Sequence, residues 1–269
     1  MPCGNTPVHF LFPEDPRDHR IPEDFFVEQA DALADAGFTY SLFGDDDLRT
    51  GRGLEGVPPA ATVVYRGWML DAVHYGLLTS AIKKAGGSPM TSERDYLATH
   101  HLPNWYPLIP ELTPESRVYP ADADLARELT ALGWGEFFVK DYVKSLKTSV
   151  GSLVRDPSEV GRVVNGLREY RGEIEGGVCV RRVEDFVAET ERRFFVVRGR
   201  AYAAHAADPI PEAVRACAGR IPSDFFSVDI VQRSDAVTRV VEVGDGQVSD
   251  LVGWSAQAFA AMWSEGVGV

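Results

Sequence analysis

Two lysines, one at a strand end and one in the following loop, are the first residues whose type and spacing predict chemistry. Lys140 ends the apolar stretch 136–140, and Lys147 follows seven residues later in the polar sequence KSLKTSVGS. Small hydroxylated residues and glycine let backbone N–H groups approach a polyanion, and lysine supplies point charges for phosphates. The pattern favours a phosphate-binding loop, although a solvated lysine-rich loop has the same composition. A Walker A loop is excluded because G-x-x-x-x-G-K-[ST] is absent.

Carboxylates in two apolar strand patterns form the second group. Asp229 lies in FFSVDIVQ, and Glu242 and Asp245 lie in VVEVGDGQ. A carboxylate is costly to bury unless it is paired or bound to a metal. On adjacent antiparallel strands Asp229 and Glu242 would converge and could hold Mg²⁺, which prefers carboxylate and phosphate oxygens. The same pattern also fits two strand carboxylates that face solvent.

Two arginines and a glutamate complete the chemically capable set. Glu191 and Arg193 lie beside the apolar run FFVV, and Arg66 follows the apolar segment ATVVY. Arginine binds phosphate or carboxylate groups bidentately, and ligands of open α/β sheets gather at the carboxyl ends of strands. The structural alternatives are a cross-strand pair for Arg193 and a buried ion pair for Arg66.

The elements that position these residues change character along the chain. Apolar strand patterns alternate with amphipathic helices at 8–13, 23–36, 38–44, 61–67 and 69–86. Such alternation predicts a parallel, Rossmann-like sheet over roughly the first hundred residues. A proline-rich stretch from Pro103 to Pro120 indicates a boundary, placed near residue 115.

Antiparallel pairs are expected after this boundary. Helices are predicted near 122–132 and 157–170, and a strand at 136–140. A hairpin pattern turns at Arg198-Gly199, and two further strands flank a turn near 233–237. The fold class predicted for the whole chain is therefore α/β followed by α+β.

Composition narrows the partners. The chain has 269 residues with 40 acidic and 27 basic side chains, a net charge of −13 that disfavours nucleic acid. Three cysteines without C-x-x-C spacing indicate neither a zinc site nor a disulfide framework. Because no segment resembles a signal peptide or a membrane span, we expect a soluble, cytoplasmic protein without a membrane partner.

The order of these motifs resembles the ATP-grasp superfamily. A Rossmann-like front end, a strand lysine, a polar loop, an E-x-R strand and paired strands with Asp and E-x-x-D follow one another. More narrowly, the chain is similar to the divergent clade named for one arginine and two lysines, which includes the eukaryotic cell-division-cycle factor that assembles translation initiation factor two. The strings LFPEDPRDHRIPEDFF and YLATHHLPNWYP also resemble bacterial stand-alone members of that clade.

The resemblance implies three units and a set of site residues. The units are a Rossmann-like N-terminal domain at 1–115, a first ATP-grasp lobe with the phosphate loop at 116–184, and a second lobe with the metal site at 185–269. The residues implied for the nucleotide are Lys140, Lys147, Arg181, Arg182, Val183, Glu184, Glu191 and Arg193, and those for the metal are Asp229, Glu242 and Asp245. Gly244 stands where many members carry a metal-binding asparagine, so Asp245 and Gln247 are both candidates for the last ligand.

The implied activity is that of a ligase. ATP and Mg²⁺ would activate a carboxylate as an acyl phosphate, which an amine or similar nucleophile then attacks. Arg66, Lys147 and Arg193 are the implied catalytic residues, and the loop 143–153 would close over the site. A non-catalytic ATP-binding assembly factor is the main alternative, and a phosphotransferase is a third. The sequence does not identify the substrates or the oligomeric state.

Overall fold

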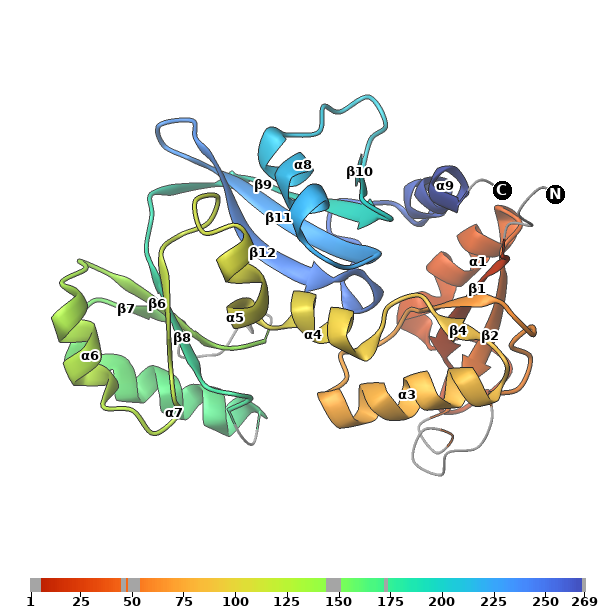
Figure 1. Ribbon diagram of the computed structural model, residues 1–269, viewed down its shortest axis with the longest axis horizontal. Coiled ribbons are helices and arrows are strands. Elements are labelled where there is room, and N and C mark those ends of the chain that lie inside the picture. The colour runs from red at the N-terminus through yellow and green to blue at the C-terminus, as the bar shows by residue number, and fades with distance from the viewer. Residues whose placement is uncertain (1–5, 45–46, 48–53, 144–150, 172–173, 268–269) are drawn as a thin grey trace.

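The computed structural model describes residues 6–44, 47, 54–143, 151–171 and 174–267 (Figure 1). In this part of the chain the strands form three four-stranded sheets. Figure 1 shows the N-terminal sheet at the right, the middle sheet at the left and the C-terminal sheet between and above them. The chemically capable residues therefore come from sheets that lie side by side.

The N-terminal sheet is parallel throughout, as the alternation of strands and helices predicts. Its strands have the order β2-β1-β3-β4 and the bounds β1 (Val8–Pro13), β2 (Thr39–Phe43), β3 (Thr62–Tyr65) and β4 (Ser88–Pro89). The short 3₁₀ turn η1 (Asp24–Phe26) and α1 (Val27–Asp35) connect β1 to β2, and α3 (Ala72–Lys84) connects β3 to β4. Parallel strands require such helical crossovers, because a tight turn cannot reverse the chain twice.

The middle sheet is antiparallel and carries Lys140. Its order is β5-β8-β6-β7, with β5 (Ser116–Tyr119), β8 (Val178–Arg182), β6 (Phe137–Asp141) and β7 (Leu153–Val154). The helices α6 (Leu125–Leu132) and α7 (Val160–Arg171), the latter preceded by η3 (Pro157–Glu159), pack on it through a core that includes Leu129, Phe137 and Val163. The apolar face is thus covered by helices, which leaves the other face for the C-terminal sheet and the cavity described below.

The C-terminal sheet is antiparallel with the order β10-β9-β11-β12. Its strands are β9 (Phe186–Val197), β10 (Arg200–Ala203), β11 (Phe225–Arg233) and β12 (Thr238–Asp245). The predicted hairpin turn joins β9 to β10, where both Arg198 (φ 48°) and Gly199 (φ 75°) adopt positive φ values. This is the conformation that a two-residue hairpin turn requires.

Helices from distant parts of the chain cover both faces of the C-terminal sheet. On one face α8 (Glu212–Arg220) and α5 (Leu102–Trp105) pack against Phe194, Phe226 and neighbouring residues. On the other face α9 (Ala256–Val267) places Trp263 between Phe225, at 4.8 Å, and Phe10 of β1, at 5.2 Å between ring centroids. The C-terminal helix therefore joins the C-terminal sheet to the N-terminal one.

The remaining short elements lie between the N-terminal and middle sheets. They are α4 (Glu93–His100), η2 (Tyr106–Leu108) and, after β12, η4 (Gly246–Val248). Cys179 and Cys217 are buried free thiols. No helix in the described ranges has both the length and the apolarity that crossing a bilayer demands.

Candidate functional site

Three of the predicted residues form a row across the C-terminal sheet. Arg193 on β9 lies directly opposite Asp229 on β11, and Asp229 lies directly opposite Glu242 on β12. Residues that are directly opposite on neighbouring strands project from the same face. The expectation that Asp229 and Glu242 meet on adjacent antiparallel strands is confirmed.

Arg193 and Asp229 form a buried bidentate ion pair. Nε and Nη2 of Arg193 donate to the two Asp229 oxygens at 2.7 and 2.6 Å, and the side chains are only 6% and 7% exposed. Nη1 of Arg193 donates to the Asp250 carbonyl at 2.7 Å. Burial disfavours the charge of Arg193, but its bonds to Asp229 outweigh burial and raise the pKa of Arg193. This pair holds a fixed positive charge on the sheet face.

Lys140 extends the row from the middle sheet. Its Nζ lies 3.4 Å from Oε1 of Glu242, and the lysine is 4% exposed. The side chains of Lys140, Glu242, Asp229 and Arg193 thus form a buried, mixed-charge row across the junction of two sheets. Opposite charges in such a row stabilise one another, and each is placed where an anionic or cationic ligand group could compete for it.

A cavity of about 480 Å³ opens beside this row, between the middle and C-terminal sheets. Apolar side chains form much of its wall, among them Phe138, Leu153, Val231 and Val241. Its polar lining comes from Glu242, Glu191 and the linker residues 181–184 between β8 and β9. A mainly apolar cavity with a few convergent polar groups has the character of a small-molecule site.

A second pocket, of about 280 Å³, adjoins the other side of the row. It is lined by Glu191, Arg193, Asp229, His205 and Asp208, among others. Glu191 lines both cavities, so two ligands bound in them would approach each other beside the Arg193–Asp229 pair.

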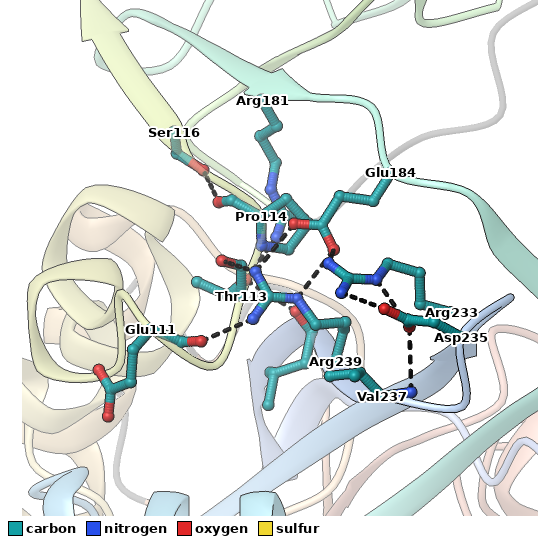
Figure 2. A network of polar contacts seen from close by, with 11 residues as sticks. Glu111, Thr113, Pro114, Ser116, Arg181, Glu184, Arg233, Asp235, Val237 and Arg239 are labelled. Atoms are coloured by element: carbon teal, nitrogen blue, oxygen red, sulfur yellow. Dashed lines mark hydrogen bonds and ion pairs between the residues drawn. The ribbon is translucent and has the colours of Figure 1, made fainter.

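The linker side chains have partners of their own (Figure 2). The Glu184 carboxylate accepts two hydrogen bonds from Arg239, each 2.8 Å long. Arg181 is buried, donating to the Val241 carbonyl at 2.5 Å and to Thr113 Oγ1 at 2.6 Å, and burial lowers its pKa to about 10. Sequence patterns gave no signal for Arg239 or Thr113, whose partners lie far away along the chain.

The other two linker residues are held mainly by their backbone. The Arg182 N–H donates to the Glu115 carbonyl at 2.8 Å, and its exposed side chain lies 4.0 Å from the Glu115 carboxylate. The Val183 N–H makes a long bond of 3.4 Å to the Glu136 carbonyl. All four predicted linker residues line the cavity of 480 Å³, and their contact with a nucleotide stays a prediction.

Arg66 has a different environment from the one predicted for a catalytic arginine. It is 1% exposed, and Nη1 donates to the carbonyls of Gly246, Gln247 and Ser249 at 2.6, 3.1 and 3.0 Å. Nε and Nη2 both donate to Oε1 of Gln29 on α1. These contacts tie the segment after β12 to the N-terminal sheet, which matches a structural role; a catalytic role for Arg66 stays a prediction.

Asp245 is separated from the other two predicted metal ligands. The register runs without a bulge from Glu242 to Asp245, and because the two are three residues apart they face opposite sides of the sheet. Oδ1 of Asp245 accepts from the backbone N–H and the side-chain Nε2 of Gln247, at 3.0 and 3.1 Å. Nε2 of Gln247 also donates to the Tyr75 hydroxyl, so the structure brings neither candidate for the last ligand to the Asp229–Glu242 pair.

Gly244 does share the face of Glu242, but two hydroxyls crowd it. A Cβ at this position would lie 3.1 Å from both Ser227 Oγ and Ser249 Oγ, which are themselves 2.7 Å apart. An asparagine there would have to displace these serines. Among the described residues no group of three or more His, Cys, Asp or Glu side chains could hold a metal. Two carboxylates are still enough for Mg²⁺ when phosphate oxygens and water complete its shell.

The buried Asp245 gives a stability prediction with a defined sign. Burial raises its pKa from 3.8 to about 7, so between these values the folded chain holds a proton that the unfolded chain has released. Stability therefore falls as pH rises through this window, by up to about 1.4 kcal/mol per unit. Asp245→Asn should remove this decline. Denaturant unfolding of both proteins at several pH values tests it, and equal slopes would contradict it.

Lys147 and most of the predicted phosphate loop fall outside the described residues, because the description breaks off between 143 and 151. The roles predicted for Lys147 and for loop closure therefore stay predictions.

The fold and the cavity between the two antiparallel sheets define the ATP-grasp class. Solved structures with this fold cover nearly the whole chain at low identity. They include D-cycloserine synthetase DcsG (16% identity, TM-score 0.60, 97% of this chain and 99% of that one). They also include a RimK domain ATP-grasp protein from Sphaerobacter thermophilus (16%, 0.62, 95% and 98%) and D-alanine–D-alanine ligase from Bacillus anthracis in complex with ATP (14%, 0.61, 97% and 97%).

A family model matches residues 131–265, half of the 269-residue chain. It describes an ATP-grasp domain, family 3 of the clade named for one arginine and two lysines. The protein therefore belongs to this ATP-grasp family. No curated protein matches the sequence. The family match begins before β6 and ends within α9, so it includes Lys140, the linker and the whole C-terminal sheet.

Proposed function

We propose that the protein is an ATP-dependent ligase that activates a carboxylate as an acyl phosphate and joins it to an amine. The observation that carries this proposal is the pair of cavities that meet at the Lys140–Glu242–Asp229–Arg193 row. One cavity has the size and apolar character for a nucleoside, and the other lies where an acceptor would meet its phosphate. Family membership supports the same interpretation.

The larger cavity would take ATP. The base would lie against Phe138, Leu153 and Val241, beside the linker backbone, and the phosphates would extend toward Lys140. The ammonium of Lys140 would bind a phosphate oxygen, because a doubly charged oxyanion competes well with the single long contact to Glu242. Lys147 would add a second charge from the loop that follows β6.

The carboxylates of Asp229 and Glu242 would hold Mg²⁺ together with phosphate oxygens. Each Asp229 oxygen accepts one hydrogen bond from Arg193 and retains a further lone pair, so the ion pair and a metal contact are compatible. When bound, Mg²⁺ would neutralise phosphate charge and act as a Lewis acid. Arg193, fixed by Asp229 and Asp250, would keep its positive charge beside the group being transferred.

The smaller pocket would take the acceptor. The solved relatives include D-alanine–D-alanine ligase and the ligase PsnB in complex with a precursor peptide, so acceptors within this fold range from small molecules to peptides. We therefore limit the proposal to a carboxylate and an amine, one of which binds beside Glu191 and Arg193.

Release of ADP from ATP and Mg²⁺ tests this function. A panel of carboxylates and amines, offered singly and in pairs, should yield one pair that releases ADP and phosphate with a product lighter by one water than its two substrates. Nucleotide binding without ADP release for any pair would contradict the ligase and favour a nucleotide-binding assembly factor. A product that carries phosphate would indicate a phosphotransferase.

A further inference from the structure

Arg239 joins three segments that are far apart in the sequence (Figure 2). It lies on β12, and its Nε and Nη2 donate to both carboxylate oxygens of Glu184 in the linker, each at 2.8 Å. Nη1 donates to the Glu111 carbonyl and Nη2 to the Thr113 carbonyl, both at 2.6 Å. The Arg239 and Glu184 side chains are each 13% exposed, so water competes little for these charge-assisted bonds.

Thr113 and Arg181 hold the same strand a second time. The fully buried Thr113 hydroxyl donates to the Val240 carbonyl at 2.7 Å and accepts from Arg181 Nη2 at 2.6 Å. Arg181 Nη1 donates to the Val241 carbonyl at 2.5 Å. We call the four side chains of Thr113, Arg181, Glu184 and Arg239 the linker clamp.

The linker clamp ends where the row of charged site residues begins. It bonds the backbone of β12 at residues 240 and 241, and Glu242 is the next residue. Arg181 belongs to β8, which pairs with β6, so the same sheet that carries Lys140 also anchors β12. The Lys140–Glu242 distance of 3.4 Å is thus set by the linker clamp as well as by the pairing of β11 with β12.

We propose that Arg239 and Thr113 are positioning residues for the nucleotide site. By fixing β12 to the linker and to β8, they place the Glu242 carboxylate beside Lys140 at the polar end of the larger cavity. The inference rests on the proposed function, because it assumes that this cavity binds a magnesium nucleotide.

Arg239→Lys is the first test. Lysine keeps the charge but, lacking the planar fork, cannot bond Glu184 and two carbonyls at once. We expect the Kd for Mg²⁺ with a non-hydrolysable ATP analogue, measured by calorimetry well below the melting temperature, to rise about tenfold. Arg233→Lys is the matched control: Arg233 pairs with Asp235 at the surface and lies 3.7 Å from Glu184, so its Kd should change less than about twofold.

Thr113→Val is a second test that changes no charge. Valine keeps the branched shape of threonine but loses the hydroxyl that bonds Val240 and Arg181, so the Kd should rise several-fold. Thr130→Val on α6 is the control, since the exposed Thr130 hydroxyl bonds the Ala126 carbonyl of its own helix. Its Kd should equal that of the wild type.

The outcomes separate the two proposals. If the wild type binds no magnesium nucleotide, the proposed function is wrong and this inference is wrong with it. If the wild type binds but Arg239→Lys and Thr113→Val bind equally well, only the positioning role is wrong. A lower melting temperature with an unchanged Kd would give the linker clamp a purely structural role and would overturn the inference too.

Discussion

Asp229→Asn is expected to reduce Mg²⁺–ATP-dependent turnover by at least about three orders of magnitude. The substitution removes one of the two negative charges proposed to hold Mg²⁺. It also leaves the buried Arg193 without its charged partner, so that Arg193 no longer has a fixed position beside the transferred phosphate. The measurement is the rate of ADP release at saturating ATP over a range of Mg²⁺ concentrations.

Asp235→Asn is the matched control for this substitution. Asp235 also pairs with an arginine, Arg233, but it is exposed and lies in the turn between β11 and β12, so turnover should stay within about twofold of the wild type. Thermal unfolding of both variants separates lost activity from lost folding, because breaking a buried ion pair costs about 3–5 kcal/mol. A folded Asp229→Asn protein with near-normal turnover would place the metal elsewhere.

Lys140→Met is expected to lower kcat/KM for ATP on the order of a hundredfold, mainly through a higher KM. Methionine fills the space of the apolar stem of the lysine but supplies no charge to a phosphate, and it removes the cation beside Glu242. Steady-state rates at varied ATP measure the effect.

Lys84→Met is the corresponding control, because Lys84 lies exposed at the end of α3. It should leave kcat/KM for ATP unchanged. If Lys140→Met behaves like this control, Lys140 does not contact the nucleotide.

Local patterns predicted the strands that carry the site. The parallel N-terminal sheet follows from the order of apolar and amphipathic segments, and the β9–β10 hairpin from Arg198-Gly199. The pairing of Asp229 with Glu242 follows from two strands joined by a short turn. Each of these features depends on residues that are close in sequence or repeat with a fixed period.

The environments of Arg66 and Asp245 depend on other information. Arg66 contacts carbonyls 180 to 183 residues away, which no local pattern shows. For Asp245 a signal did exist, because a residue three positions from Glu242 in a regular strand must face the other side. The linker clamp was equally hidden, since Arg239 and Glu184 are 55 residues apart. Helices such as α8 and α9 were also not predicted, and they acquire their buried faces only from contacts with distant strands.

The most direct measurement is a calorimetric titration of the protein with a non-hydrolysable ATP analogue, with and without Mg²⁺. A magnesium-bridged triphosphate between Lys140 and the two carboxylates predicts one saturable site per chain, strengthened by Mg²⁺ and lost or much weakened in Lys140→Met. No heat of binding, or binding that is indifferent to both Mg²⁺ and Lys140, would contradict it.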